Sequence, residues 1–108
     1  MEKNRVQKKD AVSVGDALKL FLVSSKLAAP HNTYRVNLAW DAASGAAKYT
    51  LKRFYRDRKL FITLSSSAVR SQLSFQKDAL VAKMNQILAE DELYIPDGEA
   101  AVKELILK

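Results

Sequence analysis

Residues 51–73 read LKRFYRDRKLFITLSSSAVRSQL, and this stretch decides the fold. Every second residue from Leu60 to Leu64 is a branched aliphatic, which is the period of a strand with one buried face. Residues 51–55 are aromatic and basic and predict a partner strand, and residues 56–58 form a polar turn of hairpin length. The stretch therefore predicts a basic two-stranded hairpin that leads into a helix.

The helix after the hairpin begins at a run of serines. Ser66 or Ser67 can accept a hydrogen bond from a helix N-terminal amide. Apolar residues then recur at helical spacing, which predicts one helix over residues 68–89. Its apolar positions are Val69, Leu73, Leu80, Met84, Ile87 and Leu88.

Two helices are expected before the hairpin. Ser13 and Asp16 resemble a capping box, and the apolar periodicity that follows predicts a helix over residues 13–27. Pro30 interrupts this pattern, after which Asn32 or Thr33 can cap a second helix with Trp40 on its buried stripe. Residues 1–9 are polar, basic and without periodicity, so we expect a flexible arm followed by a single domain over residues 10–108.

A last strand, residues 102–107, follows the turn signal at residues 95–98. The order helix, helix, strand, strand, helix, strand predicts an α+β fold with a three-stranded sheet and helices packed on one face. Because a helix-length crossover joins the last two strands, these two should be parallel. The predicted core residues are Leu18, Phe21, Val36, Trp40, Leu60, Ile62, Leu64, Val69, Leu73, Leu80 and Met84.

The length and composition predict a single domain with a hydrophobic core, since the chain has 108 residues of which 48% are hydrophobic. It has no cysteine, which excludes disulfides and thiolate metal sites, and no signal peptide or apolar run of spanning length. We therefore expect a cytoplasmic protein without a membrane partner. Residues 1–83 hold sixteen Lys or Arg against six Asp or Glu, whereas residues 84–108 hold two against six.

The positive charge is densest around the hairpin, and this density suits a polyanion or an acidic protein face. We predict phosphate contacts from these cations, with Tyr49, Phe54 or Tyr55 stacking on a base. The competing interpretation is an edge strand that charge protects from aggregation, with the aromatic residues in the core. The candidate nucleic-acid-binding residues are Lys48, Lys52, Arg53, Arg56, Arg58 and Lys59.

Catalytic chemistry finds little support in the sequence. The one histidine, His31, stands beside Pro30 in a predicted loop, and no nucleophile or oriented partner accompanies it. The acidic run at residues 90–92 lacks the ligand spacing of a calcium loop, and the three glycines form neither a P-loop nor a dinucleotide fingerprint. We predict no enzyme activity, no cofactor, no metal and no small-molecule substrate.

Several stretches together resemble the DciA family of bacterial proteins, formerly a domain of unknown function. The resemblance covers roughly residues 12–108 and rests on the order and spacing of its motifs. They are AWD at 39–41, GAA at 45–47, YT at 49–50, KLFITLSSS at 59–67, VR at 69–70, QL at 72–73 and VKELIL at 102–107.

The resemblance implies a K-homology-like α-α-β-β-α-β fold and a protein that loads or operates the replicative DNA helicase. It implies contact with that helicase and with DNA, and no enzyme activity. The chain departs from true K-homology domains because it has no Gly-x-x-Gly loop, the clamp that holds a nucleic-acid backbone.

The expected function is thus a non-enzymatic adaptor that binds the replicative helicase and assists its loading on DNA, with single-stranded DNA the expected nucleic acid. One alternative is a stand-alone module for single-stranded DNA or RNA, driven by the basic hairpin. Another is a purely structural protein-interaction domain that uses its acidic C-terminal quarter.

Overall fold

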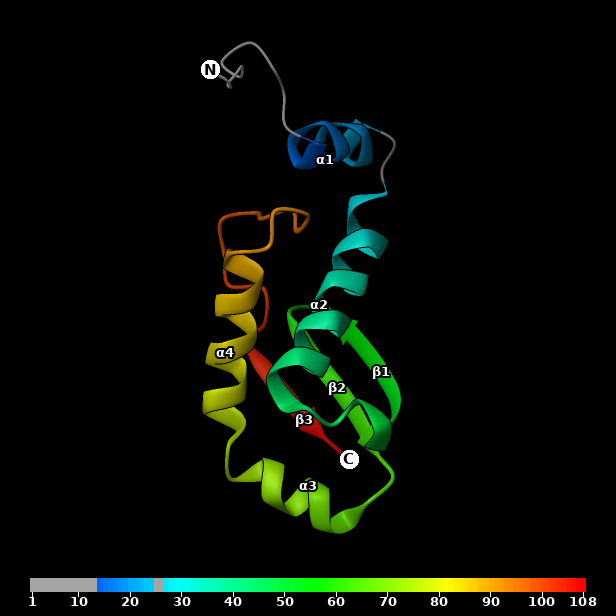
Figure 1. Cartoon of the computed structure of the whole chain (residues 1–108), viewed down its shortest axis with the longest axis vertical. Helices are drawn as coiled ribbons and strands as arrows, with labels where there is room; N and C mark the ends of the chain where they lie inside the picture. The colour runs from blue at the N-terminus through cyan, green and yellow to red at the C-terminus, as the bar shows by residue number, and fades with distance from the viewer. Residues whose placement is uncertain (1–13, 25–26) are drawn as a thin grey trace, which may run out of the picture.

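The computed structural model describes residues 14–24 and 27–108, so the predicted arm at residues 1–9 lies outside the described residues. The described elements are α1 (Val14–Ser24), α2 (Ala28–Ser44), the 3-10 turn η1 (Ala47–Tyr49), β1 (Thr50–Arg56), β2 (Lys59–Leu64), α3 (Ser67–Ser74), α4 (Lys77–Ala89) and β3 (Glu104–Leu107) (Figure 1). The predicted α+β class is confirmed. No helix within these described ranges is long and apolar enough to cross a membrane.

The strands form one mixed sheet in the order β1-β2-β3. The β1–β2 hairpin is antiparallel and β2 pairs with β3 in parallel, so the predicted parallel pairing is confirmed. Asp57 and Arg58 make the hairpin turn with φ of 53° and 64°, the left-handed region that two-residue turns of type I′ require at both positions. Strand β3 begins at Glu104 rather than at residue 102, because the N–H and the C=O of Val102 are taken by the Asn85 side chain.

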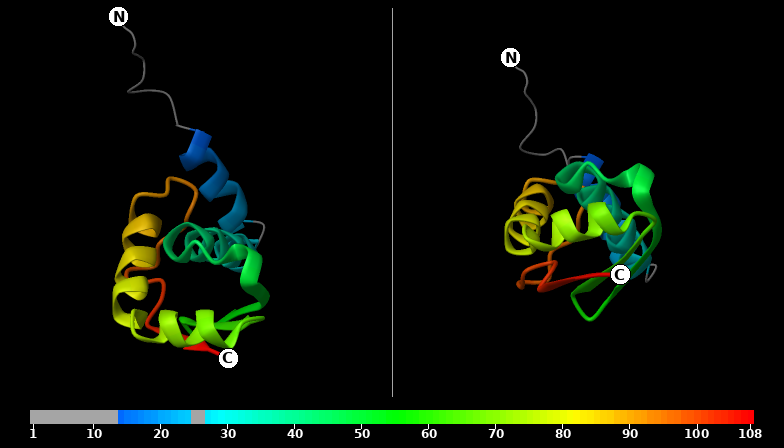
Figure 2. Two further views of the ribbon diagram at one scale, coloured as in Figure 1. Left: turned by 60° about the horizontal axis from the view of Figure 1, so that its bottom comes forward. Right: turned by 90° about the horizontal axis from the view of Figure 1, so that it is seen from below.

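Helices cover one face of the sheet and leave the other uncovered. The right-hand view of Figure 2 shows the strands along one side of the molecule, with α2, α3 and α4 on the other side. Helix α4 packs along α2, and the buried core lies between these helices and the sheet.

The core contains most of the residues that the sequence singled out. Phe21 was expected there, but its side chain is 59% exposed. None of the described side chains of α1 belongs to the main core cluster, and Leu22 is buried outside that cluster. Leu18 and Val69 are half-buried, and the other expected core residues are buried, namely Val36, Trp40, Leu60, Ile62, Leu64, Leu73, Leu80 and Met84.

Helix α2 begins at Ala28, four or five residues before the predicted caps. Pro30 is accommodated in the first turn, where the N–H that proline lacks would have no partner within the helix. The helix ends at Ser44, and Gly45 adopts a left-handed φ of 64° while its N–H bonds to the carbonyl of Asp41 at 3.0 Å.

The predicted helix over residues 68–89 is in fact two helices. Helix α3 is capped by Ser66, whose Oγ accepts a hydrogen bond from the N–H of Val69 at 3.2 Å. The chain turns at Phe75 and Gln76, where the Gln76 N–H bonds to the carbonyl of Leu73 at 2.9 Å. One continuous helix cannot follow the sheet and α2 at once, so the turn lets α3 contact β2 while α4 packs along α2.

Candidate nucleic-acid interface

Strand alternation divides the hairpin side chains between two environments. Tyr55 lies opposite Leu60 and Arg53 lies opposite Ile62, and these four residues face the helices. The intervening residues project from the other side of the sheet, which we call the open face. It is defined by Lys52, Phe54 and Arg56 of β1, Lys59, Phe61 and Thr63 of β2, and Glu104, Ile106 and Lys108 at β3.

An aromatic pair occupies the middle of the open face. Phe54 and Phe61 are direct cross-strand partners, and their ring centroids lie 5.7 Å apart with planes tilted by 47°. The Phe54 side chain is 55% exposed and Phe61 is half-buried. Lys108 brings its Nζ to 5.7 Å from the centroid of the Phe61 ring.

Three of the six predicted cations lie on the open face. Lys52, Arg56 and Lys59 are exposed there, and the described residues offer no ion-pair partner to either lysine. Arg56 makes a loose, solvent-exposed contact of 3.7 Å with Asp57, which is worth little in water. Lys48 lies apart, in η1, with its Nζ 5.2 Å from the centroid of the Tyr49 ring.

Arg53 and Arg58 have structural partners instead. Arg53 lies on the covered face and pairs with Asp41 of α2 at 2.6 Å. Arg58 donates to the Asp97 carboxylate and, at 3.0 Å, to the carbonyl of Ala100. The Arg58 carbonyl also accepts from the N–H of Lys103 at 2.7 Å, so this residue ties the hairpin turn to the segment that precedes β3.

The aromatic candidates divide in the same way. Tyr55 faces the helices, and its hydroxyl donates to the carbonyl of Ala101. Burial is the main cause that raises the pKa of Tyr55 above its ordinary value. Tyr49 packs partly against the core, so Phe54 is the predicted stacking residue that the structure places in solvent.

Sequence reasoning missed Phe61 and Lys108 as members of this surface. Phe61 sits between two core residues in the chain, and only the pairing with Phe54 shows that it faces outward. Lys108 is far from the hairpin in sequence and reaches the open face through the parallel pairing of β3 with β2. The alternation of β2 carried a signal for Phe61, whereas nothing local indicated Lys108.

His31 and its neighbour Asn32 hold the segment that follows α4. His31 lies in the first turn of α2 rather than in a loop, and its Nε2 is 2.5 Å from the carbonyl of Leu93. Asn32 exchanges two hydrogen bonds with the backbone of Ile95, at 2.8 and 2.9 Å. This anchoring role was not predicted, because the partners are some sixty residues apart in the chain.

Asp91 completes the same set of contacts. Its carboxylate accepts from Nε of Arg35 at 2.7 Å and from the N–H of Leu93 at 2.9 Å. Burial raises the pKa of Asp91, but the hydrogen bonds from Arg35 and Leu93 together outweigh burial and hold the pKa below its ordinary value. No group of three or more His, Asp or Glu that could hold a metal occurs in residues 14–24 and 27–108.

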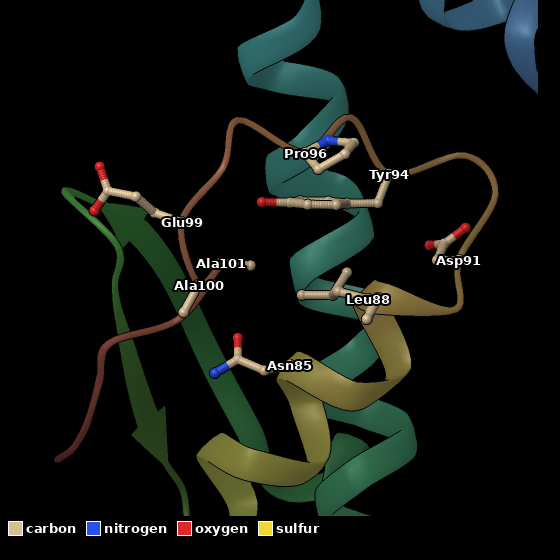
Figure 3. A pocket seen from close by; sticks show the side chains of 9 residues that line it. Asn85, Leu88, Asp91, Tyr94, Pro96, Glu99, Ala100 and Ala101 are labelled. Carbon is tan, nitrogen blue, oxygen red and sulfur yellow. The ribbon is translucent and has the colours of Figure 1, made fainter.

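A cavity of about 220 Å³ lies between α4 and this segment (Figure 3). Figure 3 shows the Tyr94 ring with Pro96 above it and Leu88 below it. Asn85 lies lower still, on α4. Both polar atoms of the Asn85 amide are taken by Val102. The cavity is smaller than the roughly 300–1,000 Å³ of typical ligand sites, so it offers a small molecule little room.

A family model described as Dna[CI] antecedent, DciA, matches residues 13–94, well over half of the chain. The chain belongs to the DciA family. Searches of curated proteins and of solved structures gave no match. Because DciA is associated with the replicative helicase as a non-enzymatic adaptor, membership supports a general role in DNA replication.

The motifs at residues 39–50 that contribute to the resemblance to DciA proteins form one structural joint. Nε1 of Trp40 donates to Oγ1 of Thr50 at 3.0 Å, and Oγ1 of Thr50 donates to the carbonyl of Ala46 at 2.8 Å. Gly45 caps α2 at the same place. These motif residues therefore fix the passage from α2 into β1, whereas the motifs at residues 59–67 and 102–107 supply Lys59, Phe61 and Ile106 to the open face.

Proposed function

We propose that this protein is a non-enzymatic adaptor that binds the replicative DNA helicase and assists its loading on DNA in the cytoplasm. The DciA match over residues 13–94 is the observation that carries this proposal. An adaptor needs one surface for the helicase and one for DNA. The described residues offer an apolar surface and a basic surface that suit these two tasks.

The fold supports a K-homology-like architecture for the adaptor. From α2 onward the elements follow the order α-β-β-α-α-β, and the mixed sheet carries helices on one face. The chain lacks the Gly-x-x-Gly clamp of true K-homology domains, so the phosphate grip has to come from other groups.

The open face is the surface that suits DNA. Its cations Lys52, Arg56, Lys59 and Lys108 outnumber its carboxylate, Glu104. Exposed cations that neutralise phosphates release counterions and add affinity that falls as salt rises. We therefore place the DNA contact on this face, and exclude Arg53 and Arg58 from it because their carboxylate partners already use them.

We place the helicase contact on the exposed side of α2 and on Leu27, the residue just before this helix. Leu27, Tyr34 and Leu38 follow each other at helical spacing and are 47%, 59% and 38% exposed. Apolar and aromatic side chains that share one exposed helix face are typical of protein-binding surfaces. This surface contains none of the three strands that form the open face, so the two partners have separate surfaces.

The test is capture of the purified replicative helicase by this protein, with and without nuclease treatment. The proposal expects nuclease-resistant capture, and loading of the helicase on DNA that increases when this protein is added. The double variant Tyr34→Ala/Leu38→Ala should weaken helicase binding about tenfold or more if these residues are central contacts. The same variant should leave oligonucleotide binding unchanged. Absence of any direct capture would overturn the proposal.

The open face also favours a second candidate, a stand-alone module for single-stranded DNA or RNA. That function expects salt-dependent oligonucleotide binding and no capture of the helicase after nuclease treatment. Capture that is insensitive both to salt and to nuclease would instead favour a purely structural protein-interaction domain.

A further inference from the structure

We propose that Phe54 and Phe61 form a base-stacking platform that makes the open face selective for single-stranded nucleic acid over duplex. The inference deepens the proposed function, and it rests on the DNA contact placed on this face. It follows from an aromatic pair at the centre of an uncovered sheet surface whose margins are basic.

The Phe54 ring is exposed to a flat ligand, and the half-buried Phe61 ring lies beside it on the neighbouring strand. They are adjacent across the strands with centroids 5.7 Å apart, and Phe54 is 55% exposed. Ile106 extends the apolar area from the next strand, since it lies opposite Phe61. Large apolar side chains gathered on a solvent-facing sheet surface usually mark a binding site.

Cations stand on both sides of the aromatic pair. Lys52 and Arg56 lie two residues before and after Phe54 on the same face of β1, a separation of about 7 Å in each direction. Lys59 stands in the same relation to Phe61, and the Nζ of Lys108 lies 5.7 Å from the Phe61 ring centroid. A base on the rings would therefore have its flanking phosphates beside cations.

This combination distinguishes single strands from duplex. In a duplex both faces of each base are stacked on neighbouring bases, so a flat aromatic surface finds no free π-face. Unpaired bases stack on aromatic side chains without regard to sequence, each worth about five- to 150-fold in affinity. The platform alone would set the preference for strandedness, while the cations bind either form through phosphates.

The experiment combines variants of the two aromatic residues with oligonucleotides that either carry or lack bases. Binding is measured as a function of salt for a single-stranded oligothymidylate of about twelve nucleotides, for an abasic oligonucleotide of the same length and charge, and for a duplex. The proteins are the wild type, Phe54→Leu, Phe61→Leu and the matched control Phe75→Leu. Phe75 is 89% exposed at the joint between α3 and α4, away from the sheet.

The wild type should prefer the oligothymidylate over the abasic strand by at least about fivefold. Phe54→Leu and Phe61→Leu should reduce that preference without changing the salt dependence, because the phosphate contacts remain. The control Phe75→Leu should behave as the wild type does, and duplex binding should be the same for every protein.

Equal binding of the two single strands by the wild type would overturn the platform and leave the phosphate contact intact. No salt-dependent binding to any oligonucleotide would overturn both the platform and the DNA contact of the proposed function. Self-association that disappears in Phe54→Leu, with unchanged DNA affinity, would assign the rings to contact between copies of the chain and overturn the inference. The first comparison uses the wild type alone, so it decides the question even if a variant fails to fold.

Discussion

The two faces of the sheet are made from alternate residues of the same strands, and they differ in almost every property. Leu60 and Ile62 are fully buried beneath the helices, whereas the residue between them, Phe61, belongs to a surface with exposed cations. The covered face pairs its one arginine of β1 with Asp41, and the open face leaves its two lysines on β1 and β2 without an ion-pair partner among the described residues. Successive residues of a strand therefore point alternately into the core and onto the open face, where we propose that they bind DNA. Substitutions on each face should affect one property and spare the other.

The largest effect is expected beneath the covered face, at Trp40. Trp40→Ala removes a fully buried ring and should lower the free energy of unfolding by about 3–5 kcal/mol. Urea denaturation followed by circular dichroism measures this loss. Trp40→Phe is the matched control, because it keeps most of the volume and loses chiefly the hydrogen bond to Thr50. An unchanged urea midpoint for Trp40→Ala would show that this ring does not stabilise the core.

A smaller effect, on binding rather than stability, is expected on the open face. Each phosphate contact contributes about −0.7 to the log-log salt slope for single strands, so losing two contacts should weaken binding about 25-fold at 0.1 M salt. Lys52→Ala/Arg56→Ala should show this loss for all sequences alike, with a shallower slope and a stability change below about 0.5 kcal/mol.

Lys77→Ala/Lys83→Ala is the control for that variant, since it removes two exposed cations of α4 and none from the sheet. Fluorescence anisotropy with a labelled oligonucleotide gives both affinity and slope. Equal losses in the two double variants would mean that net charge, rather than the open face, governs binding.

The contact that holds the segment after α4 should show an acid dependence. Because the pKa of Asp91 is below its ordinary value of 3.8 in the folded protein, this carboxylate stabilises the fold above that value. The stabilisation is lost as pH falls through the folded pKa, and we expect about 1 kcal/mol for this partly buried ion pair. Unfolding free energies at pH 6 and pH 3 should differ less in Asp91→Asn than in the wild type. Identical pH profiles of the two proteins would show that this contact adds nothing to the free energy of unfolding.

An effect of about the same size is expected at His31. His31→Ala removes one hydrogen bond to the carbonyl of Leu93 and should cost about 0.5–1.5 kcal/mol. Helicase capture and oligonucleotide binding should be retained, because the imidazole already bonds to the carbonyl of Leu93 and is not one of the residues that define either proposed surface. Loss of function in a folded His31→Ala protein would contradict the non-catalytic function, and His31→Gln tests whether a remaining donor restores stability.

Residues 59–64 show which features of the structure a local sequence pattern can predict. The period of two along β2 predicts a strand with one buried face, and the burial of Leu60, Ile62 and Leu64 agrees with it. The basic residues around it predict an interface, but the local pattern treats Arg53 and Arg58 as equal to Lys52. Whether an arginine is free depends on Asp41 and Asp97, which lie outside the hairpin.

The boundaries of the helices are likewise set partly by local sequence and partly by tertiary packing. The capping serine and the helical period after it are visible in the sequence, yet the turn at Phe75 is not, because the apolar spacing from Leu73 to Leu80 is itself compatible with one helix. The helix is interrupted because its first part packs against β2 and its second part packs along α2. Likewise, the first turn of α2 tolerates Pro30, which local rules treat as an interruption.

By itself, the sequence determined the α+β class, the hairpin, the parallel last strand, the family resemblance and the basic character of the hairpin. These properties depend on periodicity, turn chemistry and charge, which act between residues close in the chain. Tertiary structure alone decided which cations remain free, that Phe54 and Phe61 meet on the open face, and that Lys108 joins them. Those outcomes depend on strand register and on partners far apart in sequence, and no local pattern encodes the distance between such residues.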